Sequence, residues 1–184
     1  MSEIKNPLLG LIGTWEGNKG IDLAPKPDED ENNPYYETLT FELVDIDLDN
    51  AEEQELFAIR YTQTVREIAN DKVSHSEAGF WIWDKNENTI MNSFSIPRGL
   101  SVLAGGTFQN TQSNSTIIKV EAKKENENYS IVQSPFLESK ATTLGFKREF
   151  VVEGDTLSYI QETQLDIYGK DFNHKDTNTL TKVK

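Results

Sequence analysis

The chain of 184 residues carries 31 acidic and 18 basic side chains, and its formal net charge of −13 disfavours nucleic acid and anionic membrane surfaces as partners. It has no cysteine, which excludes disulfides, thiol chemistry and the usual Cys/His zinc sites. The length suits one domain, residues 1–184, and the lack of a recognisable signal peptide or of a run of roughly 18 to 20 apolar residues predicts a cytoplasmic protein without a membrane span.

In chain order, the first predicted strand opens with Gly13-Thr14-Trp15-Glu16-Gly17, directly after a short apolar turn. Small closed β-barrels with a ligand in the lumen often begin in this way. Trp15 can plug the barrel floor, and the glycines let the backbone pass closely where a strand bends. This start favours a binding barrel over an ordinary enzyme fold.

Alternation with a period of two continues along most of the chain. In the segment 38–43, Leu39, Phe41 and Leu43 share one face. Further strands are predicted at 55–65, 73–83, 89–95, 100–108, 115–122, 129–133, 146–152, 156–165 and 178–183. About ten short strands with short polar connections predict an all-β fold, a single antiparallel up-and-down β-barrel like those of lipocalins and fatty-acid-binding proteins.

Two acidic segments depart from this pattern. Residues 22–36 hold Pro25, Pro27 and Pro34 together with an acidic run, and are predicted to form a long surface insertion. Residues 45–54 are predicted to form a second acidic insertion between two strands. The segment 135–143 is expected to form one helical turn beside the barrel mouth.

The two histidines, His75 and His174, are the main candidates for chemistry, since no Gly-x-Ser-x-Gly elbow or phosphate-binding glycine loop occurs. His174 lies in the predicted connection before the last strand, at one rim of the barrel. A neutral imidazole there could coordinate a ligand-borne metal such as heme iron. The competing interpretation is a surface histidine without a role. His75 stands two residues before Glu77 and is interpreted as its buried hydrogen-bonding partner.

Several motifs, in this order along the chain, resemble those of the nitrobindin family of heme-binding β-barrels. Their shared order covers most of the chain and is more specific than any one of them. The motifs are Gly13-Thr14-Trp15-Glu16-Gly17, Arg60-Tyr61-Thr62-Gln63, Ser74-His75-Ser76-Glu77-Ala78-Gly79-Phe80, Gly99-Leu100 with Gly106-Thr107-Phe108, and Lys147-Arg148-Glu149-Phe150 with Gly154-Asp155-Thr156-Leu157-Ser158-Tyr159.

The resemblance implies a cofactor and three site residues. Heme-binding members of the family hold ferric heme b through one histidine before the last strand, and His174 occupies that position. His75 matches a pocket-side histidine that is not the iron ligand, and Lys140 is the nearest candidate for a lysine at the heme edge. In the family this site binds nitric oxide and isomerises peroxynitrite to nitrate, so enzymatic activity is expected only if heme is bound.

The chain also differs from the family pattern at two places. Lys19 stands where the family has its third motif glycine, and the interval from His174 to Leu180 is one residue longer than expected. A single-residue slip reverses which face of a strand a side chain occupies. The longer interval would therefore aim His174 out of the pocket unless a bulge absorbs it.

Two alternatives to heme stay open. A carrier or sensor for a fatty acid or another hydrophobic small molecule would need an apolar cavity with a polar anchor, for which Arg60, Arg98 and Arg148 are candidates. The nine Phe, six Tyr and three Trp could instead fill the lumen completely. The oligomeric state does not follow from the sequence.

Overall fold

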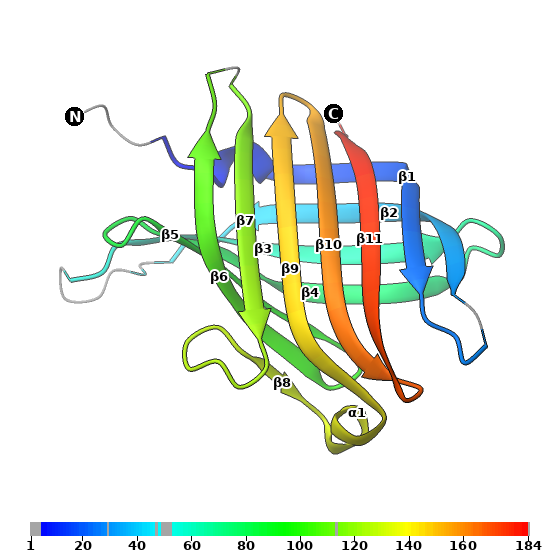
Figure 1. Ribbon diagram of the computed structural model, residues 1–184. Helices are drawn as coiled ribbons and strands as arrows, with labels where there is room; N and C mark the ends of the chain where they lie inside the picture. Colours follow the sequence, from blue (N-terminus) through cyan, green and yellow to red (C-terminus); the bar gives the residue numbers. More distant parts are fainter. Residues whose placement is uncertain (1–4, 29, 47, 49–52, 113, 184) are drawn as a thin grey trace.

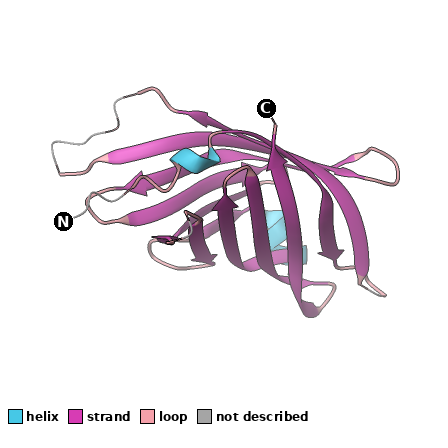
Figure 2. Cartoon of the chain, turned by 90° about the horizontal axis from the view of Figure 1, so that it is seen from above, coloured by secondary structure: helices cyan, strands magenta, loops and turns pink. Residues whose placement is uncertain are grey.

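A computed structural model describes residues 5–28, 30–46, 48, 53–112 and 114–183, and nearly all of its regular structure is β-strand (Figures 1 and 2). The elements are η1 (Leu9–Leu11), β1 (Gly13–Ala24), β2 (Glu31–Leu43), β3 (Leu56–Glu67), β4 (Val73–Asp84), β5 (Thr89–Ile96), β6 (Leu100–Asn110), β7 (Thr116–Lys123), β8 (Ile131–Gln133), α1 (Pro135–Lys140), β9 (Ala141–Glu153), β10 (Thr156–Ile167) and β11 (Lys170–Lys182).

Ten of these strands close into an antiparallel barrel. Strands next to each other in sequence are neighbours from β1 to β7 and from β9 to β11, β7 pairs with β9, and β1 pairs with β11. The short strand β8 is added beside β6. In Figure 1, β1–β4 cross the strands β6, β7 and β9–β11 at a steep angle, so the barrel is flattened into two layers. The predicted all-β, up-and-down barrel of about ten strands is confirmed, and its closure leaves few free edges.

One end of the barrel, which we call the closed end, is filled by Trp15 together with Leu8 and Leu11. All three side chains are fully buried. The indole Nε1 of Trp15 donates to the Leu11 carbonyl at 2.7 Å, and the Lys182 ammonium lies 5.0 Å from the centre of the indole ring. Trp15 therefore plugs the barrel floor, as the opening motif predicts.

The middle of the barrel is packed with aromatic rings. Phe41, Tyr61, Trp81 and Phe150 are buried, and neighbouring rings lie 4.9 to 6.3 Å apart. These distances are typical of offset and edge-to-face pairs. Aromatic side chains fill the lumen up to this level, and the space beyond it is the cavity described below.

The predicted surface insertion over residues 22–36 is wrong. Strand β1 continues to Ala24, β2 starts at Glu31, and only residues 25–30 connect them. Pro34 lies within β2, where it faces Ile21 of β1 while the pairing of β2 with β3 begins only at Tyr35. On the β3 side Pro34 contributes only its carbonyl, which accepts from Ile68 N at 3.3 Å just beyond the end of β3, so the missing N–H interrupts no regular ladder. The other predicted insertion, 45–54, lies between β2 and β3, and residues 47 and 49–52 are outside the described part.

Helix α1 forms at the predicted helical turn, with Pro135 at its start and Ser134 as its N-cap. The last strand differs from the prediction, since β11 starts at Lys170 and not near Asn178. The connection from β10 is the two-residue turn Tyr168-Gly169, and both residues have positive φ. His174 therefore lies inside a strand rather than in a loop.

Candidate ligand-binding pocket

A cavity of about 390 Å³ opens at the end of the barrel opposite Trp15, which we call the pocket end. One wall is apolar and is formed by Phe94, Ile96, Leu100, Val102, Phe146 and Leu165. The other wall is polar and includes Asp22, Gln63, His75, Gln161, His174 and Asp176. The volume and the mixture of apolar lining with a few polar groups are typical of small-molecule sites.

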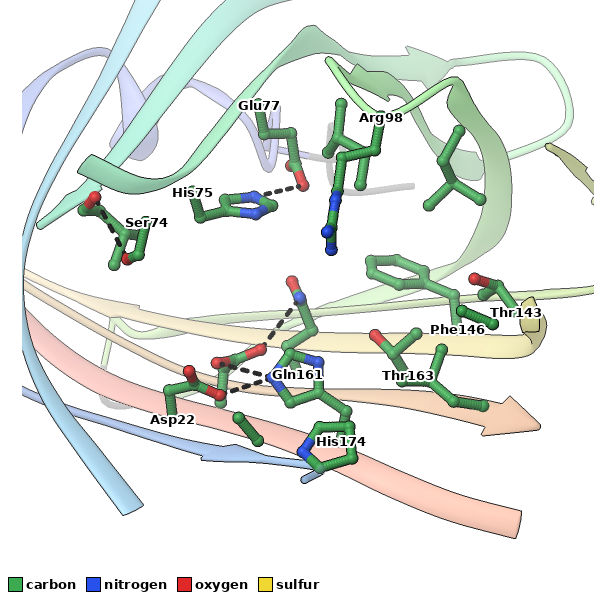
Figure 3. A pocket seen from close by; sticks show the side chains of 18 of the residues that line it. Asp22, Ser74, His75, Glu77, Arg98, Thr143, Phe146, Gln161, Thr163 and His174 are labelled. Atoms are coloured by element: carbon green, nitrogen blue, oxygen red, sulfur yellow. Dashed lines mark hydrogen bonds and ion pairs between the residues drawn. The ribbon is translucent and has the colours of Figure 1, made fainter. Parts of the chain in front are cut away.

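Register places three polar side chains of β1 and β11 together on the inner face. Asp22 lies directly opposite Asp176 in the β1–β11 ladder, and His174 is two residues before Asp176 on the same face. His174 Nε2 donates to Asp22 Oδ1 at 2.6 Å and lies 3.7 Å from Asp176 Oδ1. We call these residues the acid–histidine cluster (Figure 3).

The one-residue difference before Leu180 does not turn His174 outward. The β10–β11 ladder is continuous, with Leu157 opposite Leu180 and Thr163 opposite His174. The irregularity lies on the other side of β11, between Glu16 and Ile21 of β1. That bulge puts its extra residue on β1, and β11 itself is regular from His174 to Leu180. Because these two residues are six positions apart, they lie on the same face of β11, and the imidazole lines the cavity.

Contacts within the cluster change the pKa values of His174 and Asp176. Burial lowers the pKa of His174, but the hydrogen bond to Asp22 and the charge of Asp176 outweigh it and raise the pKa above its ordinary value. Burial, aided by the Asp22 charge and opposed by His174, raises the pKa of Asp176 to about 6. The two carboxylates thus favour the protonated form of His174 relative to a free imidazole.

His75 lines the cavity on the side facing the cluster, with its Nε2 3.6 Å from Glu77 Oε2. Glu77 is buried and forms a bidentate ion pair with Arg148, with Nη1–Oε1 and Nη2–Oε2 distances of 2.9 and 3.2 Å. The hydroxyl of Tyr61 also donates to Glu77. Burial raises the pKa of Glu77, but Arg148 overcomes this and lowers it to about 2. His75 therefore lies beside Glu77 as predicted, but its ring is partly exposed at the cavity wall, and the 3.6 Å separation is longer than a hydrogen bond.

A second buried carboxylate, Glu37, lies behind the cavity. It accepts hydrogen bonds from Gln63, Tyr159 and Asn178 at 2.7 to 2.8 Å, and Tyr35 joins this network through the Tyr159 hydroxyl. Burial outweighs these donors and raises the pKa of Glu37. No sequence motif marks Glu37 as a site residue, although its alternation with Leu39 and Phe41 places it on the inner face.

Of the four remaining candidate residues, Arg98 lines the cavity, whereas Lys140, Arg60 and Arg148 do not. Lys140 is exposed at the end of α1 and is not among the residues that line the cavity. Arg60 is exposed and pairs with Glu42 on the outer surface, and Arg148 is buried with Glu77. Arg98 lines the cavity at its rim, and no ion pair is found for it among the described residues (Figure 3). It is therefore the arginine available to an anionic group of a ligand.

Two comparisons with known proteins agree with this architecture. Residues 5–182 match the family described as the THAP4-like, heme-binding beta-barrel domain. The crystal structure of Rv2717c from M. tuberculosis superposes with a TM-score of 0.74 over 99% of this chain and 100% of that chain, at 19% identity, which supports the fold alone.

A curated relative, the uncharacterized lipoprotein YjhA of Bacillus subtilis (strain 168), is 32% identical over 75 residues. These residues are 40% of this chain, and they span only about a third (35%) of the length of that relative. In the part of the chain that the structure describes, no helix has the length and apolar character needed to cross a bilayer.

Proposed function

Because the chain belongs to the THAP4-like heme-binding β-barrel family, we propose that its cavity binds ferric heme b with His174 as the axial ligand. The family membership confirms the resemblance drawn from the sequence motifs. The observation that carries the proposal is the position of His174, whose imidazole faces the cavity across from an apolar wall. A single imidazole is sufficient to hold heme iron.

The side chains around the cavity have the chemical character that heme binding requires. The rings of Phe94 and Phe146 and the aliphatic wall supply apolar contact for a macrocycle. Arg98 at the rim can pair with a propionate, because its guanidinium has no ion-pair partner among the described residues. His75 stays engaged with Glu77 and is not proposed as an iron ligand.

The contact between His174 and Asp22 opposes this use of the ring. Nε2 is the ring nitrogen that points away from the backbone, so it is the one able to approach a bulky macrocycle, and it is now bonded to Asp22. Iron ligation requires the lone pair of a neutral ring nitrogen. We infer that Asp22 and heme iron compete for Nε2, so that removing the Asp22 carboxylate strengthens heme binding.

Heme, when bound, would supply iron chemistry toward small reactive ligands, which in the resembled family are nitric oxide and peroxynitrite. The chain's own residues would exclude water from the apolar wall and orient the imidazole. We extend the proposal to nitric oxide binding on this basis. The cytoplasmic location stays a prediction, which cell fractionation tests.

Hemin titration of the purified chain tests the proposal. We expect a Soret band that saturates at one equivalent, and a loss of this band in His174→Ala. The matched control is His75→Ala, which removes the other cavity histidine and is expected to keep the band. A His174→Ala protein with an unchanged hemin spectrum would contradict the assignment.

A non-heme carrier of an anionic amphiphile is the second candidate, favoured by Arg98 at the rim of a partly apolar cavity. A fatty acid would place its carboxylate on Arg98 and its chain against Phe94 and Phe146. Native mass spectrometry of the purified chain separates the two functions, because it would show either the mass of a lipid or the mass of heme.

A further inference from the structure

We propose that the acid–histidine cluster is a binding site for a first-row divalent cation such as Zn²⁺. Asp22, His174 and Asp176 each offer one donor atom, and the three atoms lie within 4.8 Å of one another. This proposal does not require that heme binds, although the two sites would share His174. The lack of cysteine excludes only the common Cys/His zinc sites, whereas imidazole with two carboxylates is also a suitable donor set for such metals.

The distances between the donor atoms fit a metal centre after small side-chain movements. Donors bound at 2.0–2.2 Å in tetrahedral geometry lie about 3.3 Å apart. His174 Nε2 is 2.6 Å from Asp22 Oδ1 and 3.7 Å from Asp176 Oδ1, so the two distances lie on either side of this value. Rotation of the carboxylates, without a change in the β1–β11 register, is enough to admit the ion.

The charges in this wall favour a cation. Asp22 and Asp176 are directly opposite each other on neighbouring strands, where two like charges destabilise a sheet. His174 and Arg148 offset this charge only in part, since Arg148 is itself paired with Glu77. A divalent cation would balance both carboxylates at once.

A neighbouring side chain orients one of the ligands. Gln161 Nε2 donates to Asp176 Oδ2 at 3.3 Å, while its own Oε1 accepts from Arg148 Nε at 2.8 Å. Asp176 Oδ1 is thereby left directed toward His174. Such outer partners are usual around metal ligands.

Three protein ligands leave a coordination position open, and the cluster lines the cavity. Open three-ligand sites are the kind that bind water or a substrate group. An anionic head group reaching the cavity could therefore bind the metal directly. Because a neutral imidazole has one lone pair, heme iron and the divalent cation must compete for His174.

Calorimetric titration of the chelator-treated chain with Zn²⁺, in the presence of excess Mg²⁺, tests the site. We expect one tight site in the unmodified chain and at least about 10-fold weaker binding in Asp22→Asn and in Asp176→Asn. The control is Asp171→Asn, an exposed acid on the same strand, which should bind as the unmodified chain does. Equal Zn²⁺ affinity in all four proteins would overturn the proposal.

The same variants distinguish the metal site from the heme site. Asp22→Asn is expected to weaken Zn²⁺ binding and to strengthen hemin binding, because it removes a metal ligand and a competitor of iron together. His174→Ala is expected to lose both. Loss of Zn²⁺ binding with an unchanged hemin titration in His174→Ala would support the metal site and contradict the heme ligand.

A measurement on the unmodified chain tests the site even if a variant fails to fold. The chain has two histidines, so imidazole ¹⁵N resonances can be assigned to His75 and His174. We expect one equivalent of Zn²⁺ to shift the His174 ring nitrogens and to leave those of His75 in place. Shifts at His75 alone, or at neither ring, would contradict the site.

Discussion

The two ends of the barrel share one backbone pattern and differ in what their inward positions carry. At the closed end these positions hold Trp15, Leu8 and Leu11, which are fully buried. At the pocket end the inward positions of β1 and β11 hold Asp22, His174 and Asp176. Strand pairing alone thus does not require an apolar interior, and the barrel keeps polar groups where a ligand can reach them.

Between the closed end and the pocket end, the interior of the barrel holds both aromatic rings and buried charged groups. Arg148 is buried against Glu77, and its guanidinium carbon lies 5.1 Å from the ring centres of both Phe94 and Phe146. The Glu37 network is likewise fully hydrogen-bonded. These satisfied polar groups form the floor of the cavity and separate it from the aromatic core. We therefore expect mutations at the closed end to change stability and mutations at the pocket end to change binding.

The largest effect is expected at the closed end. Trp15→Ala removes a fully buried indole and should lower the free energy of unfolding by about 3–5 kcal/mol. Urea denaturation followed by circular dichroism measures this change. Hemin affinity, measured where the variant is still folded, should stay close to that of the unmodified chain. A large loss of hemin affinity without a loss of stability would contradict the assignment of stability to the closed end and of binding to the pocket end.

The second effect concerns the Arg148–Glu77 pair and depends on pH. The folded-state pKa of Glu77 is lowered from 4.5 to about 2, so its stabilisation is complete above pH 4.5 and is lost as the pH falls toward 2. The loss is on the order of 3 kcal/mol. Glu77→Gln should remove this part of the acid dependence while making the protein less stable at neutral pH.

Thermal unfolding measured between pH 2 and pH 7 checks this prediction. Glu37→Gln is the matched control, because the pKa of Glu37 is raised and its contribution has the opposite sign. Parallel stability curves for the unmodified chain and Glu77→Gln would contradict the role given to the ion pair.

The smallest effect is expected at the cavity rim. Arg98→Ala should change the free energy of unfolding by no more than about 0.5 kcal/mol, because the side chain is exposed and has no ion-pair partner among the described residues. The affinity for hemin, or for a fatty acid, should fall by about two- to fivefold, as expected for an exposed ion pair. Arg60→Ala is the control on the outer surface and should leave both quantities unchanged.

How much of this could be predicted from the sequence depends on the residues on each face. The alternation of Leu39 and Phe41 with polar residues predicts β2, and the regular spacing of strands predicts the closed barrel. In β11, both faces are polar around His174, so no alternation marks the strand, and the sequence predicts a loop there. The same lack of contrast, together with three prolines, hides the ends of β1 and β2.

The acid–histidine cluster could not be predicted from local patterns. It depends on the pairing of Asp22 with Asp176 across the closure of the barrel, and on the bulge between Glu16 and Ile21 that sets this register. The Arg148–Glu77 pair likewise joins residues 71 positions apart. The family resemblance indicated His174, whereas its carboxylate partners follow only from the three-dimensional arrangement.

A crystal structure of the chain grown with hemin would show whether His174 holds the heme iron. We expect heme in the cavity between the Phe94–Phe146 wall and β11, with iron bonded to His174 Nε2 and with Asp22 no longer bonded to that nitrogen. Heme attached elsewhere, or a cavity without heme in which His174 keeps its hydrogen bond to Asp22, would contradict it.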